Sequence, residues 1–218
     1  MMNNIGQFII MIVPLIFAIT IHEAAHGYAA LRMGDRTAEL SGRVTLNPIS
    51  HFDLFGSLIL PLMLKLLNTS IMFGYAKPVP VNPNNYRYYR MGTLIVSSAG
   101  VAANLACAVI SGILFRALRH SEFAWTSVSS LISKKPIADM LEYSVIINLV
   151  LMVFNLIPVP PLDGSRILGM VLPDSIRPAF QEIERFGMII LIVLMMTKII
   201  DKIIHAVVNP LSNLLLGA

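Results

Sequence analysis

Long apolar runs separated by short polar stretches set the pattern of this chain. The first run extends from about Gly6 to Leu31, and another long one covers Gly92 to Leu118. Further runs cover about Met140 to Ile157 and Phe186 to Met196, the last continuing as an amphipathic stretch toward Pro210. A membrane-spanning helix needs about 20 mainly apolar residues. The pattern therefore predicts an all-α polytopic membrane protein with about four to five transmembrane helices.

One apolar run differs from the others because it is short. It covers Leu54 to Leu67 and carries Lys65, and its extension to Phe73 passes through the polar residues Asn68-Thr69-Ser70. A charged residue inside a short run is unfavourable for spanning a bilayer. We therefore expect a re-entrant or interfacial segment here.

Two stretches between the runs predict extended chain rather than helix. Gly42 to Pro48 alternates briefly and stops at an Asn-Pro pair, which is typical of a strand followed by a turn. Ala76 to Pro83 contains too many prolines for a helix or a central strand, so an edge strand or a polyproline-like segment fits better. We expect these short extended or β elements to lie near the candidate functional residues described below.

Composition agrees with the membrane interpretation. The chain has 218 residues, 56% hydrophobic and only 13% charged, which predicts a single integral-membrane domain over 1–218, with a C-terminal membrane helix and amphipathic tail at 186–218. The net charge of +4 comes from basic residues scattered through loops, which suits an anionic leaflet of the lipid bilayer and does not indicate nucleic-acid binding. Cys107 is the only cysteine, which excludes an intramolecular disulfide and a cysteine-based zinc site.

The strongest candidate chemistry lies late in the first apolar run. His22 and His26 are four residues apart, so on a helix both imidazoles point to one side and can reach one metal ion. Glu23 stands beside them, where its carboxylate can accept a proton from a metal-activated water. Ionisable residues inside a membrane helix are costly and indicate function. This cluster predicts a catalytic zinc site, which commonly has three protein ligands.

The residues alone do not identify the third zinc ligand. Asp163 follows a helix broken by prolines, where irregular backbone at membrane depth is tolerated mainly in a protein-lined cavity, but an aspartate there can equally cap the next helix. Asn155 can satisfy backbone groups freed by Pro158, and Asn104 can be a helix–helix hydrogen bond. The other candidate ligands lie close to the histidine pair in sequence: Asp35, Glu39, His51 and Asp53.

Taken together, these motifs resemble the site-2 protease family of intramembrane zinc metalloproteases, peptidase family M50. The resemblance rests on His22-Glu23-x-x-His26 followed remotely by Asn155-x-x-Pro158-x-Pro160-x-x-Asp163-Gly164. It extends to the segments 42–48 and 74–83 and to Ala99-Gly100-x-x-x-Asn104, and it covers roughly residues 6 to 172 in the right order. The likeness is greatest to short prokaryotic members without a PDZ or CBS domain. One departure is Val101, where the family usually has proline.

The resemblance implies a role for each motif. Asp163 becomes the third ligand of one zinc ion per chain, beside His22 and His26, and Glu23 becomes the general base. Asn155 is implied to bind the substrate carbonyl or the developing oxyanion. The residues implied to position the substrate are Asn104, Val79 and Val81. The implied reaction is hydrolysis of a peptide bond in or near the transmembrane segment of a membrane protein.

Two other classes of function compete with this one. A metal-binding membrane transporter or sensor would use the same ligands, but transport favours polar residues along several helices and repeated helix halves, which the sequence lacks. A catalytically silent scaffold of the same fold would not need an intact Glu23. The distribution of Lys and Arg between the predicted loops puts most positive charge on the His26 side, so the positive-inside rule predicts an active site toward the cytoplasmic side of the cell membrane.

Overall fold

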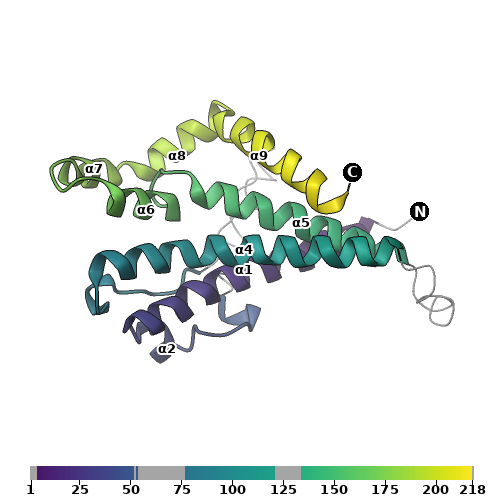
Figure 1. The fold of residues 1–218 in the computed structure, drawn as a ribbon, viewed down its shortest axis with the longest axis horizontal. Helices are drawn as coiled ribbons and strands as arrows, with labels where there is room; N and C mark the ends of the chain where they lie inside the picture. Colours follow the sequence, from purple (N-terminus) through teal and green to yellow (C-terminus); the bar gives the residue numbers. More distant parts are fainter. Residues whose placement is uncertain (1–3, 52, 54–76, 121–133, 218) are drawn as a thin grey trace.

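The structure is a computed structural model that describes residues 4–51, 53, 77–120 and 134–217. Almost all of its regular structure is helical, as the apolar runs predict (Figure 1). The elements in chain order are α1 (Asn4–Met33), α2 (Thr37–Leu40), η1 (Pro48–His51), η3 (Pro83–Asn85), α4 (Tyr89–His120), α5 (Lys134–Leu156), α6 (Asp163–Val171), α7 (Arg177–Glu184), α8 (Gly187–Met196) and α9 (Ile199–Leu216).

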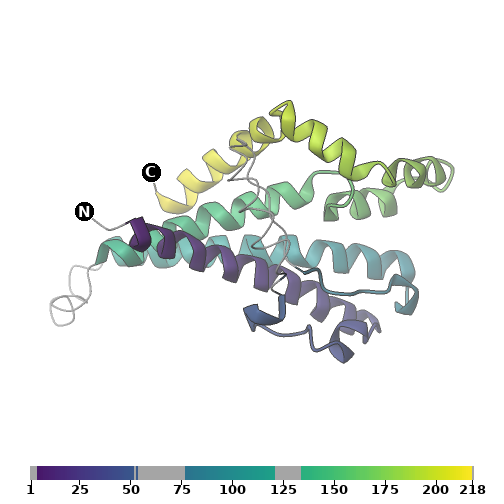
Figure 2. The same cartoon turned by 180° about the vertical axis from the view of Figure 1, so that it is seen from behind.

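Three long helices, α1, α4 and α5, form the centre of the molecule and run side by side in both views (Figures 1 and 2). The buried apolar side chains that hold α4, α5 and α9 together include Ala108, Val145, Leu149 and Val208. Because α4 and α5 run in opposite directions, the C-terminal ends of α1 and α5 lie at the same end of the bundle as the start of α4 (Figure 1). This end carries the candidate site.

Within the described residues, four helices are long and apolar enough to cross a membrane: Ile9–Met33, Tyr89–Arg119, Pro136–Leu156 and Ile199–Leu216. Their outward faces carry large apolar side chains, such as Phe17, Ile113 and Leu114, that are more than half exposed on the isolated chain. Large apolar patches of this kind on the outside of a helix bundle face lipid rather than water. The prediction of an all-α multi-pass membrane protein is confirmed.

The C-terminal region departs from its predicted boundaries. The apolar run at 186–196 forms α8, a ten-residue helix that is too short to span. Lys198 then adopts a left-handed backbone conformation, with φ of 56°, and ends the helical path before α9 begins. The stretch predicted as an amphipathic tail therefore forms α9, which is apolar and long enough to cross the membrane. A turn at Lys198 separates α9 from α8.

The predicted extended stretches are irregular. No strand forms at 42–48. Local hydrogen bonds form instead, from Asn47 N–H to Thr45 Oγ1 and from Ile49 N–H to Asn47 Oδ1, and Pro48 begins η1. The described part of the proline-rich stretch, 77–82, also has no regular structure, and it lies beside the C-terminal half of α1. The predicted re-entrant segment at 54–73 lies outside the described residues.

Candidate functional site

The histidine pair lies on α1, where one helical turn places both imidazoles against α4. Their rings meet edge to face, with centroids 4.7 Å apart. Gly100 of α4 makes this approach possible, because a Cβ atom added there would lie 2.5 Å from His22 Cε1 and 2.6 Å from His26 Nε2. A larger residue at position 100 would therefore have to displace the imidazoles.

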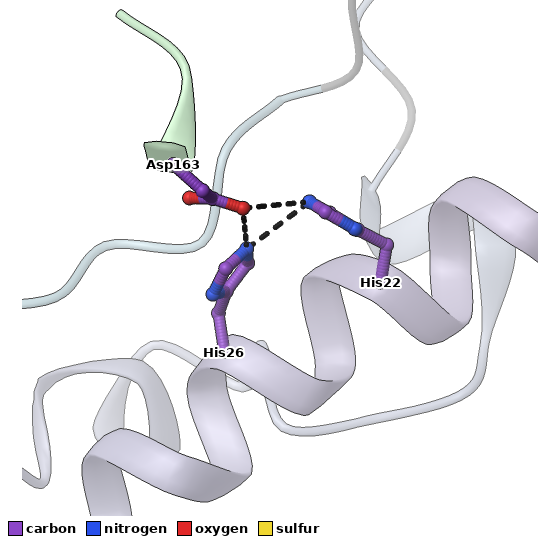
Figure 3. Close-up of side chains that lie close together, drawn as sticks. All are labelled: His22, His26 and Asp163. Carbon is purple, nitrogen blue, oxygen red and sulfur yellow. Dashed lines mark hydrogen bonds and ion pairs between the residues drawn. The ribbon is translucent and has the colours of Figure 1, made fainter. Parts of the chain in front are cut away.

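Asp163 reaches the histidines from the first turn of α6. Its neighbour Gly164 lies so close to the end of α5 that an added Cβ atom would be 2.3 Å from the Leu156 carbonyl oxygen. The N-cap residue of α6 is Leu162, and no side chain makes a capping hydrogen bond there. Asp163 is buried, with 9% of its surface exposed. The carboxylate is therefore directed at the histidine pair and does not cap its own helix (Figure 3).

The three side chains meet at one point. Asp163 Oδ2 lies 3.1 Å from His26 Nε2 and 3.4 Å from His22 Nε2, and the two Nε2 atoms are 3.1 Å apart (Figure 3). Two ligand atoms at about 2.0–2.1 Å from a tetrahedral zinc ion are separated by about 3.3 Å. The triangle thus has the dimensions of one face of a tetrahedral zinc site. Among the described residues, these three form the group of His, Cys, Asp or Glu side chains whose ligand atoms lie close enough together to hold one metal ion.

Hydrogen bonds behind the rings determine which nitrogen carries the proton. His26 Nδ1 lies 2.7 Å from the Val96 carbonyl oxygen, which can only accept, and His22 Nδ1 lies 2.6 Å from Asn104 Oδ1. Each Nδ1 therefore carries the hydrogen, which leaves a lone pair on each Nε2. Asp163 Oδ2 accepts no hydrogen bond although it is buried. Three lone-pair atoms in contact repel one another unless a cation lies between them, so this donor set fits a divalent metal.

Glu23 lies one residue from the first histidine and makes a contact that the sequence did not predict. Its Oε2 accepts the N–H of Val79 at 2.8 Å, which fastens the proline-rich segment to α1. Val79 is buried, and its Cγ1 lies 3.2 Å from the point where a Cβ on Gly27 would stand. Val81 lines a cavity of about 250 Å³ between α4 and the α6–α7 region. The general base predicted from sequence and the segment predicted to position substrate are thus in direct contact.

The remaining candidate ligands serve the surrounding structure. Asp35 is fully buried and accepts the Asn82 N–H at 2.6 Å and the Asn85 amide at 2.8 Å, besides two donors from Thr37. Burial alone would raise the pKa of Asp35, but these hydrogen bonds lower it below its ordinary value, so the side chain stays charged. It clamps the chain after Val81 to the end of α1.

Three more candidates lie outside the metal-ligand group. Glu39 pairs with Arg36 at 2.6 Å on the surface, and His51 Nε2 lies 2.9 Å from the Thr45 carbonyl oxygen. Asp53 is not a member of that group either. Asp163, which the motif resemblance favoured, is the candidate that the fold brings to the histidines.

The two predicted asparagines have different surroundings. Asn104 is fully buried and contacts the back of the His22 ring, so it supports a candidate ligand and does not line an open surface. Asn155 Nδ2 donates to the Leu151 carbonyl oxygen one turn earlier in α5, at 3.0 Å. Val101, where the family usually has proline, lies inside α4 and packs in the core between α4 and α5. The valine is therefore not at the start of a helix.

Sequence reasoning passed over two residues near the site. Gly100 belongs to the Ala99-Gly100-x-x-x-Asn104 motif, but the sequence does not predict that its missing side chain makes room for both imidazoles. Asn148 was not singled out, yet it is 2% exposed and its Oδ1 accepts from Asn104 Nδ2 at 2.8 Å. An asparagine inside an apolar helix is costly in a bilayer, so its presence in the run 140–157 was the feature of the sequence that could have indicated a role.

Known proteins resemble this chain over most of its length. A family model described as peptidase family M50 matches residues 10–198. The chain is 34% identical over 199 residues to YwhC of Bacillus subtilis (strain 168), covering 91% of this chain and 85% of that protein, which is named as a zinc metalloprotease. It is 29% identical over 204 residues to Rip2 of Mycolicibacterium smegmatis, also named as a zinc metalloprotease, covering 92% and 72% of the two chains. No solved structure matches.

Proposed function

This chain belongs to peptidase family M50 and is a zinc metalloprotease, and we propose that it cleaves membrane proteins within or near their transmembrane segments. The observation that carries the proposal is the position of the triangle of His22, His26 and Asp163. Two of its members lie on a helix long and apolar enough to span a bilayer, and the third follows the end of another such helix. A hydrolytic centre at this place meets substrates that are themselves in the membrane.

The chain's own residues divide the work of hydrolysis. His22, His26 and Asp163 would hold one zinc ion, because their Nε2 and Oδ2 atoms converge on one point. Zinc, when bound there, activates water as a nucleophile and polarises the scissile carbonyl. Glu23 accepts the proton of the attacking water and delivers it to the leaving amine. Its hydrogen bond from Val79 holds the carboxylate beside the segment that positions substrate.

The segment Val79–Val81 positions the substrate in extended form. A transmembrane helix shields its peptide bonds by internal hydrogen bonds, so the bond to be cut has to leave the helix first. Pro78 and Pro80 have no N–H, and the N–H of Val79 is engaged by Glu23. Pairing with a substrate strand would therefore use the carbonyl oxygens of this segment, which accept from N–H groups of the unwound substrate, and the N–H of Val81.

Asn155 supplies a donor to the oxyanion that forms at the scissile carbonyl. Its amide nitrogen carries two hydrogens: one donates to the Leu151 carbonyl oxygen at 3.0 Å, and the other is the donor for the oxyanion. Replacement by alanine (Asn155→Ala) should lower turnover by about 10²–10³ while zinc remains bound, the usual cost of one oxyanion donor. Turnover of a membrane substrate and metal content, measured on the same preparation, check this. A variant that turns over at the parental rate would assign Asn155 to its own helix backbone.

The active site faces the cytoplasm. The end of α1, the segment after it and the start of α4 carry most of the Lys and Arg near the helix ends, including Arg32, Arg36, Arg43, Lys77, Arg87 and Arg90. The end of α4 and the start of α5 carry Arg116, Arg119, Lys134 and Lys135. Excess Lys and Arg in short loops mark the cytoplasmic side.

Cysteine labelling in intact cells measures this orientation. In a Cys107→Ser background, a membrane-impermeant thiol reagent should fail to label Asn84→Cys and should label Ser129→Cys. Ser129 lies outside the described residues, in the connection between α4 and α5. Labelling of Asn84→Cys from outside would reverse the proposed orientation.

Zinc removal separates a protease from the two competing functions. A chelator should abolish cleavage of a membrane-anchored substrate by the purified protein in liposomes, and added zinc should restore it, because two imidazoles and a carboxylate have no catalytic power alone. A transporter would instead move zinc across the liposome membrane without cleaving anything. A silent scaffold would cleave nothing at any zinc concentration.

A further inference from the structure

A line of polar side chains runs through the apolar centre of the helix bundle. Asn104 on α4 and Asn148 on α5 are 0% and 2% exposed, and they contact each other between membrane-spanning helices. One end of the line is His22, and the other is the backbone of α5 at Ser144. Buried amides in a bilayer are costly unless each of their groups has a partner. Here all the groups in the line are paired.

The partners fix the direction of every amide in the line. Asn148 Nδ2 lies 2.8 Å from the Ser144 carbonyl oxygen, which can only accept, so Asn148 Oδ1 is the atom that faces Asn104. Asn104 Nδ2 then donates to Asn148 Oδ1 at 2.8 Å and to the Ala18 carbonyl oxygen at 3.3 Å. Asn104 Oδ1 is left facing His22 Nδ1 at 2.6 Å, and it can only accept.

We propose that Asn148 is a positioning residue for the metal site: through Asn104 it holds His22 with the hydrogen on Nδ1 and the lone pair of Nε2 directed at the zinc ion. The proposal rests on the proposed role of His22 as a zinc ligand. His26 needs no such line, since the Val96 carbonyl oxygen contacts its Nδ1 directly. The two ligands are thus oriented by different means, one by backbone and one by a pair of side-chain amides on two other helices.

The same contacts would also serve as plain adhesion between helices. Interhelical hydrogen bonds of polar side chains stabilise membrane bundles, and α4 and α5 share another, between Ser111 Oγ and Ser144 Oγ at 2.8 Å. The Ser111 bond joins the same two helices and meets the line only at Ser144 Oγ, to which Asn148 Nδ2 makes a second, longer contact of 3.3 Å. Deleting it leaves the 2.8 Å bond from Asn148 Nδ2 to the Ser144 carbonyl oxygen, which fixes the amide. Ser111→Ala therefore removes adhesion between the two helices and keeps the orientation of Asn148, which makes it the matched control.

Zinc affinity of the purified full chain, measured by competition with a chelator of known affinity, tests the proposal. Asn148→Leu keeps the branched shape of the side chain but removes the amide, so Asn104 loses its fixed orientation and zinc should bind about tenfold or more weakly, as for other outer-shell partners. Ser111→Ala should bind zinc like the parent. Nitrogen chemical shifts of the histidines in the zinc-free protein should show one His22 tautomer in the parent and a mixture in Asn148→Leu.

Each outcome decides one question. Parental zinc affinity and a single His22 tautomer in Asn148→Leu would overturn the proposal, as would an equal loss in Ser111→Ala. If Asn148→Leu does not fold, Asn148→Ser provides the same comparison, because its short hydroxyl no longer holds the Asn104 amide at its present distance. If the parent binds no zinc, or if His22→Ala binds zinc as tightly as the parent, the proposed zinc site itself is wrong. That outcome differs from one in which only the role of Asn148 is wrong.

Discussion

Replacing Asp163 by alanine should release zinc and abolish proteolysis. The variant leaves two imidazoles, whose Nε2 atoms are 3.1 Å apart, without the oxygen that completes the triangle. Loss of an outer-shell partner already costs about 10–100-fold in metal affinity, so loss of a direct ligand should cost more. Metal content after dialysis and cleavage of a membrane substrate measure the two effects together.

Asp174→Ala is the control for this experiment. Asp174 is exposed and pairs with Arg177 at 2.6 Å, beyond the end of α6, so its removal alters a nearby carboxylate without touching the triangle. It should retain zinc and activity. Full zinc content and cleavage in Asp163→Ala would show that a different residue completes the site.

Replacing Glu23 by glutamine should separate metal binding from catalysis. Glutamine has nearly the same shape, and its amide oxygen can still accept the Val79 N–H, so the segment that positions substrate should stay in place. It cannot accept the proton of the attacking water. Turnover should therefore fall by about 10²–10⁴, the contribution of a positioned general base, while zinc content remains that of the parent.

The control here is Glu39→Gln. It neutralises a surface glutamate that pairs with Arg36, just after the end of α1. Its turnover should match the parent. Parental turnover in Glu23→Gln would exclude Glu23 as the base. Loss of zinc in Glu23→Gln would instead mean that the carboxylate is needed to build the site.

Hydrophobic length was enough to predict the central helices and the general class of the protein. The runs at 6–31, 92–118 and 140–157 correspond to α1, α4 and α5, because a bilayer requires continuous apolar helices. The break at Lys198 was not predictable in this way. Apolar composition continues on both sides of it, and a lysine with positive φ leaves no clear trace in hydropathy.

The candidate site was predictable to the extent that its residues are close in sequence or form a known motif. His22 and His26 share a helix face by their spacing alone. Asp163 is about 140 positions away, and physical reasoning left it equally suited to cap a helix; only the motif resemblance favoured it. Gly100 and Asn148 act through contacts between helices, which no local pattern specifies. The strand expected at 42–48 is replaced by local side-chain hydrogen bonds.

The position of the cut in a membrane substrate tests the central proposal most directly. The parent protein and Glu23→Gln are placed in liposomes with a single-span substrate that carries a soluble domain on each side, and mass spectrometry identifies the new termini. We expect zinc-dependent termini inside the span or within a few residues of its cytoplasmic end, and none with Glu23→Gln. Termini found only in the soluble domains, or equal amounts of product from Glu23→Gln, would contradict it.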